Sequence, residues 1–366
     1  MPLPQRSGMY GDHEPDLPGI THTMKIKRIL SLISLVGMTG GAILEAETGS
    51  SQSSDPESRL VFLSNESVEI GIFPELAGSV MVFRKPGGEN FLYVHPEDWL
   101  DWEPTIPDPH QLGTWTDFFG HIMWLGPQSD FWNQQDVLPE MQGQWWPPDP
   151  YLVYGNYRIL EQTEDSLSLE GPESPYTGVK LTKTYHLNGE KVEIEVVATN
   201  SGERNLKWDL WSNTRVPPKW PFLVPVAGLE SARIDPAKLN VIEWSADAGF
   251  FSFDLTPSAK GESESAKAFV SASQPWIAAF SEDTVFVKAF EMVDPSAISP
   301  GQSLVEVYYS KNTDIDKAFV ELEAHGPYTL LKPGKSTTFH ETWSLLPFDG
   351  ENTRESRIAW AKKNLE

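Results

Sequence analysis

The sequence predicts an all-β protein with one large antiparallel domain. From residue 59 onward, apolar and polar residues alternate in short runs, as in residues 68–73, 179–185 and 192–196. A period of two is typical of half-buried strands. Asn188-Gly189 separates the last two runs and is a strong signal for a tight hairpin. Helical periodicity is almost absent before Pro347, so we expect strands to form the core.

Later runs continue the same pattern. Strands are expected at residues 284–291, 304–310, 318–323 and 337–345, with Ser299-Pro300-Gly301 and Lys332-Pro333-Gly334 as turns. Residues 354–365 are predicted to form a helix that covers an edge of the sheet. The sequence contains no glycine-rich phosphate loop and no repeat of fixed period. These absences argue against nucleotide-binding folds and propellers.

The first 58 residues have the features of an export signal followed by a linker. Residues 24–46 combine a short basic stretch with an apolar stretch rich in Gly and Ser, which is typical of a secretory signal peptide. The apolar stretch is too short for a membrane span, so no integral membrane segment is expected after signal removal. We expect residues 1–23 to be unstructured, with translation beginning at Met24, and residues 47–58 to be a linker. The protein is therefore predicted to be periplasmic or secreted.

Composition limits the class of function. The chain has 366 residues, of which 39% are hydrophobic, and 28 Lys and Arg oppose 52 Asp and Glu, giving a net charge of −24. Such a surface repels phosphate backbones, so nucleic acid is not an expected partner. The absence of cysteine excludes disulfides, thiol catalysis and thiolate metal sites. No His/Glu spacing resembles a zinc site, so we expect no metal and no cofactor.

Tryptophan is concentrated in one segment. Half of the fourteen tryptophans lie between residues 99 and 146, among Pro, Asp and Gly. A surface rich in aromatic and polar side chains suits sugars, because their C–H faces pack on aromatic rings and their hydroxyls pair with carboxylates, amides and imidazoles. We therefore expect a carbohydrate ligand, with Trp115, Trp124 and Trp145 as a stacking wall and Asp117 among its polar partners. Burial of these indoles in the core is the alternative.

Several passages resemble a known family. Residues 183–203 and Leu206-Lys-Trp-Asp-Leu-Trp-Ser212 resemble the central strands of galactose mutarotase-like proteins, which form the floor of a sugar cleft. Residues 319–335 resemble that family's C-terminal passage, in which a strand ends in a catalytic Glu. Gly120-His-Ile-Met-Trp-Leu-Gly-Pro127 resembles an element of the uncharacterised DUF4380 group within this superfamily. The resemblance covers residues 59–346 and implies a β-supersandwich domain, with residues 347–366 as a tail.

The resemblance also implies a reaction. Aldose 1-epimerases (mutarotases) exchange sugar anomers with a base that takes the proton of the C1 hydroxyl and an acid that protonates the ring oxygen. By position in the matching passage, Glu323 is the base. Glu321 lies two residues earlier, on the same face of a strand, and is the reserve.

The acid is harder to assign from the sequence. The histidine that mutarotases carry after the central strand is missing, since residues 210–216 read Leu-Trp-Ser-Asn-Thr-Arg-Val. We expect His121 in the Trp-rich segment to replace it, ahead of the weaker candidates His110, His325 and His340. Asn213 is a candidate sugar ligand, and Arg215 is expected to orient the sugar because an arginine cannot act as a general acid near neutral pH.

Other functions stay open at this point. The missing histidine is equally consistent with a carbohydrate-binding protein of the same fold that has lost catalysis. A glycoside hydrolase or a polysaccharide lyase is less favoured, because neither class is marked by a recognisable spacing of its residues. A structural envelope protein would bury all the indoles in its core. The sequence does not identify the sugar or the oligomeric state.

Overall fold

The structure is a computed structural model that describes residues 55–366 apart from 112–116, 119, 236–241, 256–264 and 311–317. The chain divides into Met1–Ser53 and Ser54–Glu366, and every element described below belongs to the second unit. The predicted signal peptide and the predicted start at Met24 lie outside the described residues. At the end of the predicted linker, Pro56–Arg59 form a short 3-10 helix, η1, capped by the carboxylate of Asp55.

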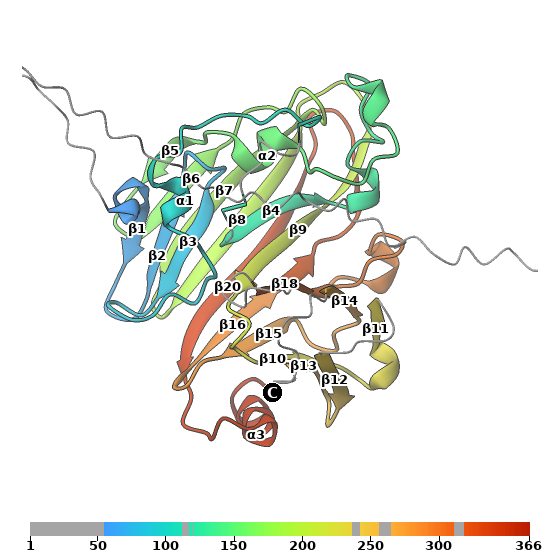
Figure 1. Cartoon of the computed structure of the whole chain (residues 1–366). Coiled ribbons are helices and arrows are strands. Elements are labelled where there is room, and N and C mark those ends of the chain that lie inside the picture. Colours follow the sequence, from blue (N-terminus) through green and yellow to red (C-terminus); the bar gives the residue numbers. More distant parts are fainter. Residues whose placement is uncertain (1–54, 112–116, 119, 236–241, 256–264, 311–317) are drawn as a thin grey trace, which may run out of the picture. The chain divides into compact units, whose positions relative to one another are not determined.

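Two large antiparallel sheets make up the described part of the chain (Figure 1). The first sheet has the order β1-β2-β3-β4-β9-β18-β17-β14-β11, and β19 pairs with β9 beside this path. Its strands in chain order are β1 (Val61–Ser64), β2 (Glu69–Phe73), β3 (Ser79–Arg84), β4 (His121–Gly126), β9 (Leu206–Val216), β11 (Ala232–Asp235), β14 (Ser265–Val270), β17 (Val305–Ser310), β18 (Phe319–His325) and β19 (Thr329–Leu331).

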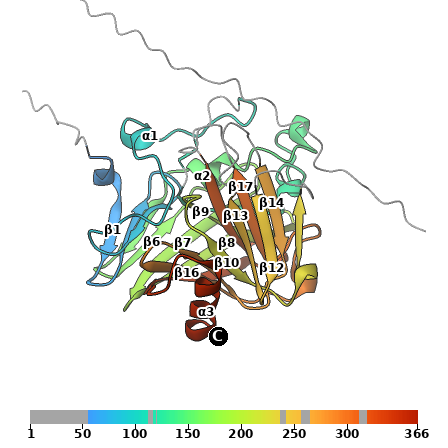
Figure 2. The ribbon, with the colours of Figure 1, turned by 60° about the horizontal axis from the view of Figure 1, so that its bottom comes forward.

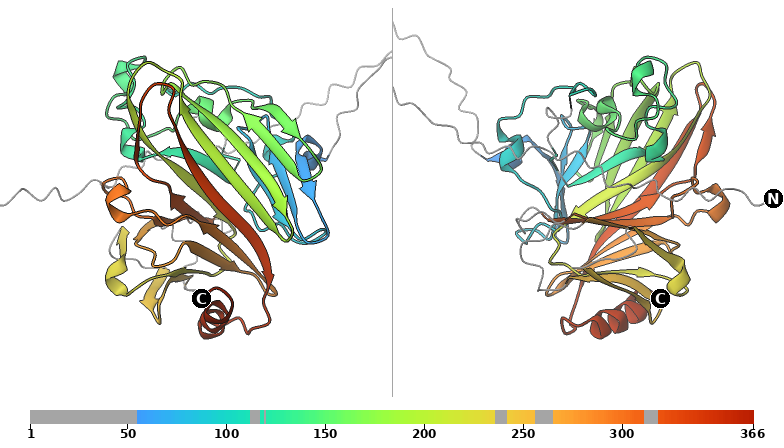
Figure 3. Two further views of the ribbon diagram at one scale, coloured as in Figure 1. Left: turned by 180° about the vertical axis from the view of Figure 1, so that it is seen from behind. Right: turned by 45° about the vertical axis from the view of Figure 1, so that its right-hand side comes forward.

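The second sheet has the order β12-β13-β10-β15-β16-β20-β8-β7-β6-β5. Its long neighbouring strands β7, β8 and β20 run side by side in the view from behind (Figure 3). The strands are β5 (Arg158–Gln162), β6 (Ser166–Glu170), β7 (Val179–Asn188), β8 (Lys191–Asn200), β10 (Phe222–Pro225), β12 (Ile242–Asp247), β13 (Phe250–Leu255), β15 (Trp276–Phe280), β16 (Thr284–Phe290) and β20 (Ser336–Pro347). The predicted all-β class is confirmed.

The predicted hairpin is confirmed with a shift of one residue in its turn. Strands β7 and β8 pair from Val179↔Asn200 to Asn188↔Lys191, so the two loop residues are Gly189 and Glu190. Gly189 has a φ of 61°, a left-handed conformation that glycine adopts without steric cost. Along β7, fully buried residues alternate with partly exposed ones, as the period of two predicts.

The inner faces of the two sheets share one apolar core. Trp343 of β20 is fully buried, and its ring meets those of Phe83 of β3 and Phe286 of β16 at centroid distances of 5.0 and 5.2 Å. Strand β9 differs from the outer strands, because ten of its eleven residues are buried. Both faces of β9 are therefore covered. Strands β18, β17 and β14 follow β9 in the sheet, and β17 and β14 lie side by side in Figure 2.

Helices are short and few among the described residues. They are α1 (Glu97–Leu100), α2 (Pro150–Tyr154) and α3 (Arg354–Asn364), with 3-10 turns η3 (Gln128–Asp130), η4 (Pro139–Met141), η5 (Leu229–Ser231) and η6 (Pro295–Ala297). The predicted C-terminal helix is confirmed as α3, which begins after the Thr353 cap. Its Ile358 and Trp360 pack in one cluster with Leu223 of β10 and Phe280 of β15. The helix therefore covers a face of the second sheet. The prediction from the sequence that it covers an edge is wrong.

Candidate functional site

The predicted base lies on the outer face of the first sheet, which we define as the face turned away from the second sheet. Strands β9 and β18 pair with Glu321 opposite Arg215, Glu323 opposite Asn213 and His325 opposite Trp211. Alternate residues of a strand point to the same face, so these six side chains share the outer face. The structure thus brings together four predicted residues: Glu323, Glu321, Asn213 and Arg215.

A lysine from a third strand neutralises the predicted base. Lys267 of β14 donates from Nζ to both carboxylate oxygens of Glu323, at 2.8 and 2.6 Å. The same Nζ lies 3.0 Å from Oε2 of Glu306 on β17. The side chains of Glu323 and Glu306 are 0% and 2% exposed, whereas that of Lys267 is 17% exposed. One ammonium therefore sits against two buried carboxylates and keeps some contact with solvent.

Aromatic groups frame the same carboxylate. Trp211 donates from Nε1 to Oε2 of Glu323 at 2.8 Å, and its ring lies 4.8 Å from the Nζ of Lys267. The ring of His325 stacks on Trp211 with a centroid distance of 5.2 Å. Asp209 Oδ1 lies 3.4 Å from Nδ1 of His325. Trp211 therefore fixes the position of the Glu323 carboxylate through a hydrogen bond and holds the imidazole behind it.

Burial and neighbouring charge perturb the titration of this group. Burial, helped by the carboxylates of Glu321 and Glu306 and opposed by Lys267, raises the pKa of Glu323 to about 7. Burial lowers the pKa of His325, but the carboxylates of Glu306 and Asp209 outweigh it and hold that pKa above its ordinary value. A carboxyl that titrates near neutrality can take and return a proton under physiological conditions.

The reserve candidate Glu321 is engaged with a different partner. Nε of Arg215 donates to Oε1 of Glu321 at 2.7 Å, and Nη1 of the same arginine forms a short ion pair with the half-exposed Asp117. Burial raises the pKa of Glu321, but the charges of Arg215 and Lys267 outweigh it and hold that pKa below its ordinary value. Glu321 is thus a fixed carboxylate anchor for Arg215, and Glu323 is the carboxyl suited to proton transfer.

Several buried polar atoms on this face have no hydrogen-bond partner among the described residues, and Oδ2 of Asp209 and Nε2 of His325 are two of them. Both side-chain atoms of Asn213, Oδ1 and Nδ2, are buried and unpaired, and so is Nε1 of Trp124. An unpaired buried amide costs folding free energy. Such groups are suited to pairing with the hydroxyls of a ligand.

The predicted stacking wall is only partly assembled. Trp124 of β4 meets Trp211 edge to face at 4.9 Å and Trp146 at 6.0 Å, so the Trp-rich segment does reach the Glu323 face. Trp145 is 52% exposed and contacts Trp146 at 6.5 Å, on the solvent side of this row. Trp115 lies outside the described residues. Trp211, which belongs to β9 and not to the Trp-rich segment, is the indole that hydrogen-bonds Glu323.

The structure does not place His121 with Glu323. His121 begins β4 and belongs to the opposite set of alternating residues, so it points into the core between the sheets. Its Nδ1 lies 3.0 Å from Thr214 Oγ1, its Nε2 lies 3.3 Å from Glu341 Oε1, and its ring meets Trp343 edge to face. Burial lowers the pKa of His121 well below its ordinary value. The expected pairing of His121 with Glu323 across one sugar is therefore not met.

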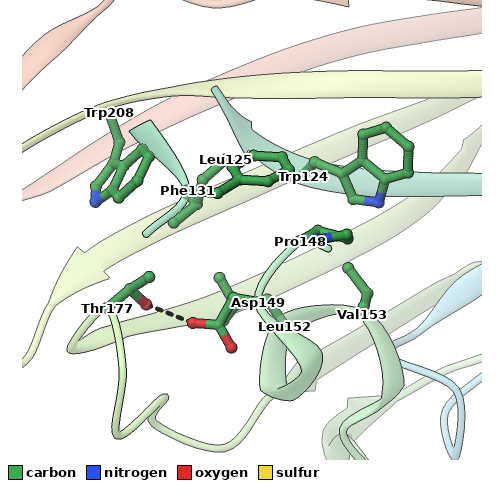
Figure 4. A pocket seen from close by; sticks show the side chains of 9 residues that line it. All are labelled: Trp124, Leu125, Phe131, Pro148, Asp149, Leu152, Val153, Thr177 and Trp208. Carbon is green, nitrogen blue, oxygen red and sulfur yellow. Dashed lines mark hydrogen bonds between the residues drawn. The ribbon is translucent and has the colours of Figure 1, made fainter. Parts of the chain in front are cut away.

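A small cavity lies beside the Trp-rich segment (Figure 4). It has room for about one water molecule, and Asp149 on its wall accepts a 2.8 Å hydrogen bond from Thr177. The residues that line it are Trp124, Leu125, Phe131, Pro148, Asp149, Leu152, Val153, Thr177 and Trp208. None of these residues belongs to β18, and the cavity is too small for a sugar.

The geometry also bears on metal binding. One ligand atom each from Glu306, Glu323 and His325 lie within 4.8 Å of one another, a donor set that suits a divalent cation. The ammonium of Lys267 already lies within 3.0 Å of both carboxylates. Because a metal ion would have to displace this cation, the residues do not fit a metal site.

Comparison with known proteins gives the family. The model of the DUF4380 family, described as a domain of unknown function, matches residues 59–346. The chain belongs to the DUF4380 family. No curated protein sequence matches it.

Several solved structures are similar to this DUF4380 protein at low sequence identity. The Slr1438 protein from Synechocystis sp. PCC 6803 is 14% identical, covers 78% of this chain and 95% of its own length, and has a TM-score of 0.51. A galactose mutarotase related enzyme from Lactobacillus acidophilus is 10% identical, with coverages of 78% and 97% and a TM-score of 0.48. A putative aldose 1-epimerase from Escherichia coli K12 is 14% identical, with coverages of 79% and 99% and a TM-score of 0.43. The predicted supersandwich with a short C-terminal helix is confirmed.

Sequence reasoning missed two charged residues that complete this DUF4380 site, Lys267 of β14 and Glu306 of β17. Lys267 and Glu306 were not candidates, although each is a charged residue within an apolar strand sequence, which is a recognisable signal. His325 was ranked below His121, yet it lies on the face of Glu323 because it follows Glu323 by two residues in the same strand.

Among the described residues, no helix is long and apolar enough to cross a membrane.

Proposed function

We propose that this protein is a carbohydrate isomerase of the aldose 1-epimerase type, which binds a sugar on the outer face of the first sheet. The observation that carries the proposal is Glu323, a fully buried carboxyl with a pKa of about 7 beside an indole and an unpaired amide. General bases work best when their pKa lies near the operating pH. The low identity of the similar structures leaves this proposal to rest on the site itself.

In the proposed reaction, Glu323 takes the proton of the C1 hydroxyl. An acid protonates the ring oxygen as the bond from C1 to that oxygen breaks, and the open-chain aldehyde rotates before the ring closes again. Trp211 supports this role by holding Oε2 of Glu323 with its indole N–H. A fixed carboxylate spends no entropy on orientation during the reaction.

The surrounding groups supply the contacts that a sugar needs. The indoles of Trp124 and Trp211 offer aromatic surface, and Asn213 offers both a donor and an acceptor without competition from another described residue. Arg215 is held by Glu321 and Asp117, which fixes its remaining N–H groups in direction. This pairing of ring surface with fixed polar groups is typical of carbohydrate sites.

Anomer exchange tests the proposal directly. Purified protein is added to freshly dissolved α-anomers of neutral aldoses, and the approach to equilibrium is followed by NMR. We expect acceleration by the wild type and a loss of about 10²–10⁴-fold with Glu323→Gln. Glu195→Gln is the matched control, since Glu195 is a half-exposed carboxylate of β8 in the second sheet.

Two other outcomes have definite meanings. Saturable quenching of tryptophan fluorescence without acceleration of anomer exchange would replace the isomerase with a carbohydrate-binding protein of the same family. Neither binding nor acceleration with any aldose tested would refute the proposal.

We further propose that the protein is exported, on the basis of the signal-like residues 24–46. N-terminal sequencing of the protein from a Gram-negative expression host is the test. Cleavage after residue 42 or 46, with recovery in the periplasm, is expected. An intact N-terminus in the cytoplasm would contradict export.

A further inference from the structure

We propose that Lys267 is the acid of this site, whose ammonium gives its proton to the ring oxygen while Glu323 takes the proton of the C1 hydroxyl. The proposal rests on the isomerase function above and supplies the acid that the sequence lacks. It assigns a catalytic role to a residue of β14 that lies outside the passages resembling mutarotases.

The distance between the two groups suits the substrate. The Nζ of Lys267 and the oxygens of Glu323 are direct hydrogen-bond neighbours, at 2.6 and 2.8 Å. The C1 hydroxyl oxygen and the ring oxygen of an aldose are bonded to the same carbon, so they also lie close together. A neighbouring donor and acceptor can therefore engage both oxygens of one sugar from one side.

Exposure places Lys267 where a ligand arrives. Of the two side chains, that of Lys267 is 17% exposed and that of Glu323 is not exposed at all. Tyr308, which stands opposite Lys267 on β17, is also only partly buried. A sugar approaching from solvent therefore meets the ammonium first and reaches the carboxylate beside it.

The proton transfers balance without net charge. The pair begins as an ammonium and a carboxylate, and it ends ring opening as an amine and a carboxylic acid. The proton of the C1 hydroxyl moves to Glu323, and the electrons of the broken O–H bond form the carbonyl. The electron pair of the bond from C1 to the ring oxygen moves to that oxygen, which takes the proton of Lys267. Ring closure reverses both transfers, and the net charge of the pair stays at zero throughout.

The two transfers also support each other. Burial lowers the pKa of Lys267, but the carboxylates of Glu323 and Glu306 outweigh it and hold that pKa well above its ordinary value. When Glu323 accepts its proton, the strongest of these attractions disappears, and the ammonium becomes a stronger acid. Lys267 therefore becomes able to donate at the moment when the ring oxygen needs a proton.

Other groups near Glu323 are less suited to this role. Arg215 keeps its proton at any ordinary pH. The imidazole of His325 is fully buried, with its ring stacked on Trp211 and its nitrogens directed to Asp209 and Glu306. It lies behind the indole, as a positioning residue for Trp211.

Substitution of Lys267 with retention of charge separates catalysis from structure. Lys267→Arg keeps a cation against Glu323 and Glu306 but cannot give up a proton near neutral pH. We expect a loss of about 10²–10⁴-fold in anomer exchange, with sugar affinity, from tryptophan fluorescence, within threefold of the wild type. Lys180→Arg is the matched control, since Lys180 lies on β7 of the second sheet and is paired with Glu170. An exchange rate for Lys267→Arg equal to that of the control would overturn the proposal.

Chemical rescue provides a readout that a structural role would not move. In Lys267→Ala, added methylammonium or ethylammonium should restore part of the exchange rate. Tetramethylammonium, which has no proton to give, should not. Equal rescue by tetramethylammonium would show that only positive charge is needed and would overturn the proposal. If the alanine variant does not fold, the arginine variant decides.

The outcomes also separate this inference from the proposed function. A wild type without exchange activity removes both. A wild type that loses its activity with Glu323→Gln and keeps it with Lys267→Arg removes only the assignment of the acid.

Discussion

The ion pair between Lys288 and Glu341 in the core allows a sharp test of how the two sheets are held together. Nζ of Lys288 on β16 lies 3.5 Å from Oε2 of Glu341 on β20, and both side chains are 0% exposed. Lys288 also donates to Thr214 Oγ1 at 2.7 Å and to the carbonyl of Leu322 at 2.9 Å, both on the first sheet. Ser212 donates to Oε2 of Glu341 at 2.8 Å. The pair lies within the second sheet and joins it to the first sheet through these hydrogen bonds.

Removal of both partners should cost less free energy of unfolding than the sum of the two single removals. Lys288→Met leaves a buried carboxylate, and Glu341→Gln leaves a buried ammonium, so each should lower the free energy of unfolding by about 3–5 kcal/mol. The double variant removes both charges of this pair. Its loss should fall short of the sum of the single losses by about 2–3 kcal/mol, which is the coupling free energy of the pair.

Urea unfolding followed by tryptophan fluorescence measures all four free energies. The slope with urea should stay constant across the four proteins, because the same surface is exposed on unfolding. The half-exposed pair of His340 on β20 and Glu195 on β8 is the matched control, and it should show a coupling below about 0.5 kcal/mol. Additive losses for Lys288 and Glu341 would refute the reasoning, since they would mean that neither charge depends on the other.

Four further outcomes are expected. Burial lowers the pKa of Lys183 to about 7, so between pH 7 and 10.5 the unfolded chain binds more protons than the folded one. The free energy of unfolding should therefore rise with pH, by about 2 kcal/mol from pH 7 to 9. Lys183→Met should flatten this rise in urea titrations. Gly126→Ala should lower the free energy of unfolding by about 1–3 kcal/mol, because the added Cβ would lie 2.1 Å from Asp209 Oδ1. Gly202→Ala is the control and should be nearly neutral, because its Cβ would make ordinary contacts at 3.5 Å. Because carboxylates outnumber cations on the outer face, a uronate should bind at least about tenfold more weakly than the matching neutral sugar in fluorescence titrations, a difference of about 1.4 kcal/mol. Dialysis against EDTA should leave anomer exchange unchanged, and its loss on dialysis would contradict the metal-free assignment.

The sequence predicted the half of the site that depends on local pattern. Glu323 and Glu321 were placed on one strand face by their spacing, and the strand register puts Asn213 and Arg215 directly opposite them. These positions follow from a period of two and from one pair of neighbouring strands. The period of two carries no information about which strands lie further along the sheet, so Lys267 could not be found in this way.

The error over His121 has a related cause. The prediction treated residues 120–127 as part of a loop, in which any side chain can turn toward a ligand. The segment is strand β4, in which His121 and Trp124 fall on opposite faces. Once the segment is a strand, Trp124 near Trp211 and His121 in the core follow together. The residue pattern does not distinguish a loop from a strand for so short an apolar run.

Strand β9 links the interior ion pair to the outer face. Its residues Ser212 and Thr214 bind Glu341 and Lys288 inside, while Trp211, with Asn213 and Arg215, points outward to Glu323 and its neighbours. A slip of β9 by one residue would exchange the two sets and bury the guanidinium and indole in the core. Because β9 is buried on both faces, hydrophobicity alone does not distinguish the two registers. The interior hydrogen bonds do distinguish them, since Ser212 and Thr214 pair with Glu341 and Lys288 in the observed register. The ion pair therefore selects the register that presents Trp211 and Asn213 at the proposed sugar site.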